Sequence, residues 1–347
     1  SAMSAGDREE PAMWPREAAS WIVSQADHVT VLEAGIRSLA DTLQPVFERG
    51  EYSLASWRRH PLNPKSADGR AVSWVFLADT LNFSFWSDAE ADAKFCVTYA
   101  GERHTGYWSL CAAINRTLDE GFDLLDPKLW PGLTLDRLIH LLRGDRSEMP
   151  LMQERLDCLQ ETGRILVDRY GGDFNNVLLA AAGSARRLLE LVVTEFPCYR
   201  DVSVYKGCRV GLYKRAQILV ADIWGALEGA GPADFNDIDC LTAFADYRIP
   251  QALEYFGVLQ YGPSLREALN ERRMLPNGHP MEVEIRGATI HAVELLASEM
   301  RRRFSTSGNG HRLINSVLLD HYLWDYRRQF ADKIDHLPFH RTRCIYY

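Results

Sequence analysis

The chain has 347 residues, of which 46% are hydrophobic and 25% are charged, a balance typical of a folded protein with a sizeable core. The formal net charge of −8 disfavours broad binding to duplex nucleic acid, and no apolar run approaches the roughly 18 residues that a membrane span needs. Seven cysteines are odd in number and form no C-x-x-C pair, which indicates reduced thiols instead of disulfides or a zinc site. No basic-then-apolar leader opens the sequence, so we expect a cytoplasmic protein. Without a cluster of metal-ligand residues or a long apolar run, we also expect no metal and no membrane partner.

The first predicted helix follows from apolar periodicity. Apolar residues between Leu32 and Leu43 step by four, three and four residues, which predicts one buried stripe with Pro45 near its end. The segment 60–69 is rich in Pro, Asn and Gly and is predicted to be a loop. The first third of the chain therefore begins with a helix and a loop.

Aromatic and β-branched runs follow this loop. The segments 72–77 and 81–86 are short and apolar and are predicted to be strands, with 95–99 as a third. The segment 106–118 has helical spacing again. We therefore expect a small β element in the first third of the chain.

Helices dominate the remainder. Thr134 is a candidate N-cap of a helix that ends near 143–144, and 281–286 alternates apolar and charged residues, which predicts one late strand. The other predicted helices are 151–170, 174–195, 212–227, one or two within 239–256, 290–303 and 315–330. The pattern as a whole predicts a mostly α protein.

An acidic segment, residues 234–251, is the most distinctive part of the chain. Four of its first thirteen residues are Asp, and they are set among Phe, Ile, Leu and Tyr instead of Lys, Ser and Gly. Carboxylates in an apolar segment are costly to desolvate unless they are paired or used. Two interpretations stay open, namely helix caps with a surface turn, or a functional site.

Three segments together resemble the queuosine salvage protein family. They are 78–86 (ADTLNFSFW), 213–218 (YKRAQI) and 241–251 (LTAFADYRIPQ), in this order and spacing. The resemblance implies a helix-hairpin-helix DNA-glycosylase-like fold. It also implies a hydrolase that cleaves the N-glycosidic bond of queuosine 5'-monophosphate and releases queuine for tRNA-queuosine salvage. No cofactor is implied, and the expected partner is this small molecule, with no direct nucleic acid.

The resemblance extends from about residue 17 to the end of the chain. It implies a single catalytic domain, 17–347. This domain could consist of two packed subdomains, about 17–130 with the β element and about 131–347, which is helical.

The implied reaction needs carboxylates for a chemical reason. Queuine is a 7-deazaguanine, so carbon replaces N7 and the usual protonation site of a leaving purine is lost. The enzyme must therefore stabilise an oxocarbenium-like sugar or hold the base through other atoms. From the resemblance, Asp246 is the first catalytic candidate and Asp239 the second, since either could lie beneath C1' and position water.

The resemblance also assigns substrate-binding residues. The base and its cationic amine would contact His104, Phe235, Asp237 and Tyr247. The 5'-phosphate would contact Lys214 and Arg215, at the start of a helix.

Structural interpretations compete with several of these assignments. Lys214 and Arg215 could be a solvated basic pair and His104 a structural residue, while Asp79 and Asn82 could stabilise a turn. Asp320 and Trp324 share a helix face that could simply be packed. At the level of function, a DNA or RNA base glycosylase and a non-catalytic binder of modified nucleosides stay open. The charge of −8 and the lack of a compact Gly-rich hairpin loop disfavour the glycosylase.

Overall fold

The computed structural model describes residues 10–90, 93–308, 310 and 313–347, so the first nine residues, to which the expectation of no leader applies, lie outside it. Most of the described chain is helical, which confirms the predicted mostly α fold. The α-helices are α1 (Pro15–Gln25), α2 (Glu33–Glu48), α3 (Ser56–Arg59), α4 (Gly69–Thr80), α5 (Tyr107–Asp119), α6 (Leu135–Leu141), α7 (Met152–Tyr170), α8 (Phe174–Ala180), α9 (Ala185–Glu195), α10 (Lys214–Ala226), α11 (Ile249–Tyr255), α12 (Pro263–Asn270), α13 (Pro280–Thr306), α14 (Ser316–Gln329) and α15 (Ala331–Ile334). Short 3-10 helices are η1 (Pro127–Gly132), η2 (Pro197–Tyr199), η3 (Gly231–Ala233) and η4 (Ile238–Cys240). No helix in the described ranges combines the length and apolarity that crossing a bilayer requires.

Three antiparallel strand pairs accompany the helices in the described part of the chain. The predicted strand at 95–99 is confirmed as β2 (Cys96–Tyr99), which forms a hairpin with β3 (Glu102–Thr105). The sequence did not predict the hairpin of β4 (Val202–Tyr205) and β5 (Cys208–Gly211), or the pair of β1 (Val29–Val31) with β6 (Leu259–Tyr261). These pairs are too small to form a layer, so the helices carry the architecture.

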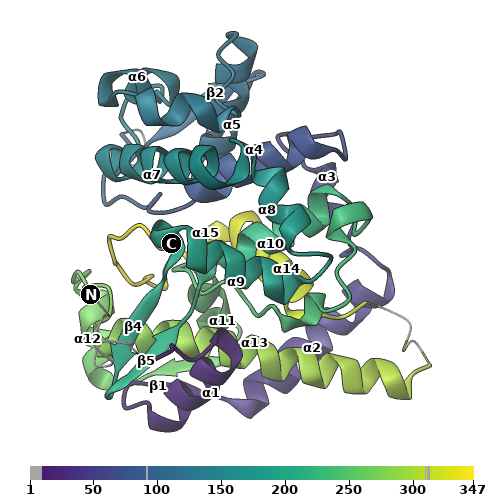
Figure 1. Ribbon diagram of the computed structural model, residues 1–347. Helices are drawn as coiled ribbons and strands as arrows, with labels where there is room; N and C mark the ends of the chain where they lie inside the picture. The colour runs from purple at the N-terminus through teal and green to yellow at the C-terminus, as the bar shows by residue number, and fades with distance from the viewer. Residues whose placement is uncertain (1–9, 91–92, 309, 311–312) are drawn as a thin grey trace, which may run out of the picture.

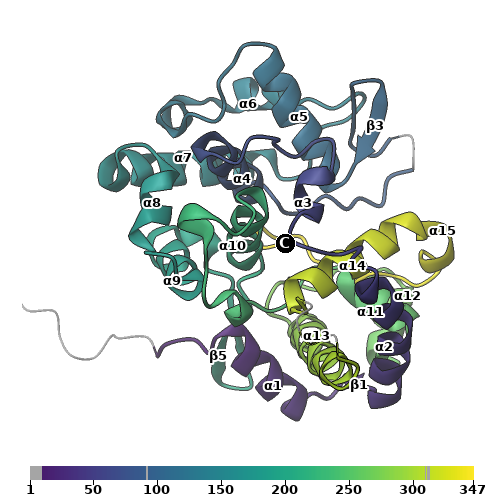
Figure 2. The same cartoon turned by 90° about the vertical axis from the view of Figure 1, so that its right-hand side faces the viewer.

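Two packed helix pairs, α4 with α10 and α11 with α14, contribute to the middle of the molecule. In Figure 1 and Figure 2, α5 and α6 lie at the top, α1, α2 and α13 at the bottom, and α10 and α14 between them. Helix α10 packs on α4, and α11 packs on α14. One continuous apolar core extends from α2 through α4, α7 and α10 to α14.

The predicted strands 72–77 and 81–86 are wrong. Residues 72–77 lie in α4, whose N-cap Asp68 accepts a hydrogen bond from the Ala71 N–H at 3.1 Å. This helix is buried on nearly all sides, and a continuous apolar run cannot distinguish such a helix from a buried strand. Residues 81–86 form no strand pair, and the guanidinium of Arg155 binds the carbonyl oxygens of Leu81, Phe83 and Ser84.

The predicted late strand 281–286 is also wrong, because it lies within α13. Its charged residues are buried and paired, which produced the misleading alternation. Glu284 accepts bonds from the Asp27 and His28 N–H groups and from the Tyr205 hydroxyl, and Arg286 binds Asp201 through both terminal nitrogens. Burial with partners satisfies these charges inside a helix.

The predicted helix 174–195 is interrupted. It divides into α8 and α9 because Ala182 and Gly183 adopt positive φ and Ser184 then caps α9 by accepting a hydrogen bond from the Arg187 N–H. The predicted helices in 32–43, 106–118, 151–170, 212–227, 290–303 and 315–330 are confirmed as α2, α5, α7, α10, α13 and α14.

Candidate active site

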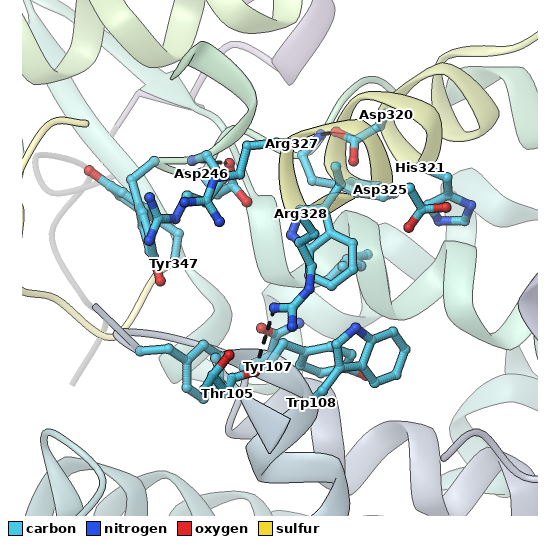
Figure 3. Close-up of a pocket in the computed structure, with 18 of the residues that line it drawn as sticks. Thr105, Tyr107, Trp108, Asp246, Asp320, His321, Asp325, Arg327, Arg328 and Tyr347 are labelled. Carbon is cyan, nitrogen blue, oxygen red and sulfur yellow. Dashed lines mark hydrogen bonds between the residues drawn. The ribbon is translucent and has the colours of Figure 1, made fainter. Parts of the chain in front are cut away.

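A cavity of about 710 Å³ is lined by α10 on one side and α14 on another. Its walls come from segments far apart in the sequence, including α3, the loop before α5, α10, residues 244–248 and α14. Figure 3 shows Asp246 and the α14 side chains Asp320, Asp325, Arg327 and Arg328 facing Tyr107 and Trp108 across this space. The volume is in the range of pockets that enclose a small-molecule ligand.

One face of α10 forms part of the wall. Lys214, Ile218 and Asp222 are four residues apart, so their side chains lie on the same face of the helix, and all three line the cavity. The start of this helix is held firmly, because the Lys214 N–H donates to Asp201 at 3.0 Å and Asp201 is itself bound by Arg286. Helix α10 therefore presents a cation and an acid from a rigid support.

Asp246 is fixed by the main chain at the start of α11. Its Oδ1 accepts hydrogen bonds from the N–H groups of Arg248 and Ile249, at 2.9 and 2.8 Å. Its Oδ2 has no hydrogen-bond partner within the described ranges, and the half-buried carboxylate lines the cavity. One oxygen therefore holds the side chain in place while the other is free to meet a ligand.

Lys214 lies among carboxyl groups instead of at the surface. Its side chain is buried, and burial lowers the pKa of its ammonium, although the charges of Asp246, Asp79 and Asp320 oppose that shift. No hydrogen bond or ion pair engages Nζ among the residues that the structure describes. The positive charge of Lys214 offsets the repulsion among these three carboxyl groups.

Asp320 ties the acidic segment to α14. Its Oδ2 accepts a hydrogen bond from the Phe244 N–H at 2.8 Å, and burial together with the charge of Asp246 raises its pKa well above the usual range. The neighbouring His321 has its pKa lowered to about 4 by burial, so its imidazole is neutral at physiological pH. On the next turn, Asp325 accepts a hydrogen bond from the Tyr52 hydroxyl at 2.8 Å.

Three arginines form a cationic cluster on another part of the wall, and we call Arg248, Arg327 and Arg328 the arginine cluster. Burial, and then the charge of Arg327, lowers the pKa of Arg248 to about 10 and also lowers that of Arg328. Asp335 forms an ion pair with Arg327, and the charges of Asp246 and Asp325 partly offset those of Arg248 and Arg328. Three guanidinium groups gathered at one cavity wall favour an anionic ligand.

Flat side chains line the wall opposite α14. The rings of His60 and Trp108 stack with centroids 3.3 Å apart, and Trp324 meets Trp108 edge-on at 5.8 Å. Arg328 lies over the Trp324 ring and reaches the Thr105 carbonyl oxygen at 3.5 Å, the dashed contact in Figure 3. Burial lowers the pKa of His60 to about 4, so its ring is neutral at physiological pH, and the stacked rings suit a planar base.

The structure brings three of the predicted site residues to the cavity, namely Asp246, Tyr247 and Lys214. It places Asp237 elsewhere, at the start of α9, where its carboxylate accepts bonds from the Ser184 hydroxyl and from the N–H groups of Ala185 and Arg186. The helix-cap interpretation thus applies to Asp237, and Asp246 both caps a helix and lines the cavity.

Four other predicted site residues also lie outside the cavity lining. Asp239 is exposed, Phe235 is packed in the core, and His104 lies in β3. Arg215 is buried, and its guanidinium donates to the carbonyl oxygens of Asp79, Thr80 and Cys198. Because its charge is engaged in joining two segments of the fold, Arg215 is not placed to meet a phosphate.

Several cavity residues were not predicted as site residues. Asp222 could have been found from helical spacing, because it lies two turns after Lys214 on the same face. Asp320 and Trp324 were recognised as a shared helix face, and that face lines the cavity. Nothing in the local sequence singles out Arg327 or Arg328. Across the described ranges, no group of three or more His, Cys, Asp or Glu side chains is arranged to hold a metal ion.

Comparison with known proteins gives the family. The family model of the queuosine salvage protein matches residues 62–347. A protein from Mus musculus named queuosine 5'-phosphate N-glycosylase/hydrolase is 44% identical over 339 residues, covering 97% of this chain and 99% of its own. Proteins of the same name from Bos taurus and Sphaerobacter thermophilus are 46% and 36% identical, covering 96% and 94% of this chain and 98% and 95% of their own. The chain therefore belongs to the queuosine salvage protein family.

Proposed function

We propose that this protein is a hydrolase that cleaves the N-glycosidic bond of queuosine 5'-phosphate and releases queuine for salvage. The names of its full-length relatives support this activity. The structural observation that carries it is Asp246, a half-buried carboxylate that lines the cavity and is held by two N–H groups through one of its oxygens. Such a group stabilises positive charge at the sugar without having to reorganise.

Asp246 is the proposed catalytic carboxylate. As the bond between C1' and the base nitrogen breaks, the sugar gains oxocarbenium character, and Asp246 lies against it and positions the attacking water. Lys214 lies within reach of the charges of both Asp246 and Asp320 and offsets the repulsion between them. We favour Asp246 over Asp239, because the exposed side chain of Asp239 does not line the cavity.

The arginine cluster is the proposed 5'-phosphate site, in place of the pair Lys214 and Arg215. Burial, and then the charge of Arg327, lowers the pKa values of Arg248 and Arg328, and a dianionic phosphate would stabilise the charged guanidinium groups against both effects. Its binding energy then positions C1' against Asp246.

The base is proposed to stack on the flat wall of His60 and Trp108. Queuine carries a secondary amine that is cationic near neutral pH, and the exposed carboxylate of Asp325 can form a charge-assisted hydrogen bond with it. Tyr247, retained from the sequence-based assignment, lines the same cavity.

Residues 17–347 are proposed to form one catalytic domain of the helix-hairpin-helix DNA-glycosylase type. The continuous core supports a single unit, since it joins elements on both sides of residue 131. We also propose that the enzyme acts in the cytoplasm and on the free nucleotide, and the net charge of −8 favours a free nucleotide over duplex nucleic acid.

The test is incubation of the protein with queuosine 5'-monophosphate and detection of free queuine and ribose 5-phosphate by mass spectrometry. Queuosine-containing tRNA and an oligonucleotide with a damaged base are run beside it. Release of queuine from the nucleotide alone is expected. Binding without turnover, or release from a nucleic acid only, contradicts the proposal.

A further inference from the structure

Two carboxyl groups from different helices meet beside the cavity. Asp222 lines the cavity from α10 and is 5% exposed, while Asp79, near the end of α4, is 0% exposed. Asp222 Oδ1 accepts a hydrogen bond from Trp57 Nε1 at 2.9 Å, and Asp79 Oδ1 accepts one from Asn82 Nδ2 at 3.1 Å. The side chains of Asp79 and Asp222 are also in hydrogen-bonding contact with each other.

This pair must share a proton. Asp79 Oδ2 is sealed from solvent and finds no N–H or amide donor in the described structure. A buried carboxylate oxygen without a donor is strongly destabilising, and two adjacent buried carboxylates cannot both be ionised. A proton between the two groups removes both problems.

The proton is assigned to Asp222, the member of the pair that lines the cavity. Burial and then the charge of Asp79 raise the pKa of Asp222 well above its usual range, with smaller opposing effects from Trp57 and Lys214. Burial raises the pKa of Asp79 as well, but hydrogen bonds from Asp222 and Asn82 lower it. Facing the pair from α5, Tyr107 and Cys111 have raised pKa values, mainly through burial, and stay neutral.

We propose that Asp222 is the proton donor to the departing base, a role that rests on the proposed glycosidic cleavage. Because position 7 of queuine is carbon, the proton has to reach a ring nitrogen of the leaving group. Asp222 and Asp246 line the same cavity, and in this proposal Asp222 gives a proton while Asp246 receives one, an arrangement typical of acid–base pairs. Asp79 is a positioning residue that holds the proton on Asp222 until it is needed.

The step balances without any co-reactant. The C1'–N bond breaks and its electron pair goes to the base, which takes the proton of the Asp222 carboxyl. The water oxygen bonds to C1', and its proton passes to Asp246. When the products leave, Asp246 loses its proton to solvent and Asp222 regains one, so the net reaction is hydrolysis.

Asp222→Asn isolates proton donation. The amide still accepts from Trp57 and donates to Asp79, but it has no acidic proton. The variant is compared with wild type on queuosine 5'-monophosphate and on two ribosides, the phenyl and the 4-nitrophenyl β-D-ribofuranoside 5-phosphates. These two share shape and lack a base, but only 4-nitrophenolate leaves without protonation. We expect kcat/KM to fall by roughly 100-fold or more on queuosine 5'-monophosphate and the phenyl riboside, and to change by less than about 3-fold on the nitrophenyl riboside.

Equal losses on the two ribosides would overturn the proposal in favour of a structural role, and so would full activity of the variant on queuosine 5'-monophosphate. Asp123→Asn is the matched control, because Asp123 is exposed and pairs only with Arg70 at the surface. Asp246→Asn should lose activity on all three substrates. A wild-type protein that cleaves none of them refutes the glycosidase function itself, a different pattern from failure of Asp222 alone.

Asp79→Asn tests the shared proton independently. In this variant Oδ1 can still accept from Asn82, but the amide nitrogen that replaces Oδ2 is uncharged and donates instead of accepting. Both changes favour the ionised form of Asp222 and lower its pKa from the level that burial and the Asp79 charge set. Activity that needs protonated Asp222 is present below its pKa and lost above it. The loss of kcat/KM for the phenyl riboside at alkaline pH should therefore move to lower pH in this variant. An unmoved profile would show that the two carboxyls do not share a proton.

Discussion

Asp246 and Asp237 are nine residues apart in one acidic segment, and the structure predicts opposite effects for their substitution. In Asp246→Asn, Oδ1 still accepts the N–H groups of Arg248 and Ile249, so the start of α11 is preserved. The lost charge at a helix N-terminus costs only about 0.3–1 kcal/mol. An uncharged amide nitrogen replaces the free Oδ2 and cannot stabilise positive charge at C1', so kcat should fall on the order of 100- to 1,000-fold.

Asp237→Ala should do the reverse. It removes acceptors for the Ser184 hydroxyl and for two N–H groups at the start of α9, worth about 2–3 kcal/mol together for a partly exposed cap. In a chain of 347 residues each kcal/mol corresponds to about 1–2 °C in Tm, so the midpoint should fall by roughly 3–5 °C. At a temperature where the variant is folded, kcat should stay close to wild type.

Queuine release followed by mass spectrometry and thermal unfolding followed by circular dichroism measure both quantities on the same preparations. Asp239→Asn is expected to change neither, because its exposed side chain lies outside the cavity lining. If Asp246→Asn retained more than about a tenth of kcat, a barrier change below roughly 1.4 kcal/mol, the catalytic assignment would be refuted. If Asp237→Ala lost turnover with an unchanged Tm, the separation of cap and site within the segment would be refuted.

Three further predictions concern the surrounding groups. Arg328→Gln should lower kcat/KM for queuosine 5'-monophosphate by about 10-fold or more and leave queuosine nearly unaffected; equal losses on nucleotide and nucleoside would remove Arg328 from the phosphate site. Arg215→Met should lower the Tm markedly and leave kcat of the folded enzyme nearly unchanged, because it leaves the carbonyl oxygens of Asp79, Thr80 and Cys198 without their donor. A loss of kcat/KM on the nucleotide but not on the nucleoside would return Arg215 to the phosphate site. Burial lowers the pKa of His340 to about 3, so this residue is neutral in the native state, whereas in the unfolded chain it takes up a proton below about pH 6.5. His340 therefore favours unfolding as the pH falls from about 6.5 towards 3, by up to about 1.4 kcal/mol per pH unit. Urea unfolding at pH 7 and pH 5 should therefore show a smaller loss of stability in His340→Gln than in wild type, and identical losses would contradict this contribution.

The sequence by itself determined the mostly α class, the family and most of the long helices. The stripe from Ile36 to Leu43 and the cap at Thr134 are local signals, since helical spacing and an N-cap side chain act within one or two turns. The acidic segment was also recognised as unusual, and one of its four aspartates, Asp246, lines the cavity.

Tertiary structure alone decided which neighbouring residues share a role. Lys214 and Arg215 are adjacent, but successive residues on a helix point about 100° apart, so Lys214 lines the cavity while Arg215 binds carbonyl oxygens in the interior. The runs 72–77 and 281–286 became helices because their surroundings bury them on every side and supply partners for Glu284 and Arg286. The contact of Asp79 with Asp222 joins two helices far apart in the chain, and a shared proton between them arises only where packing excludes water from both.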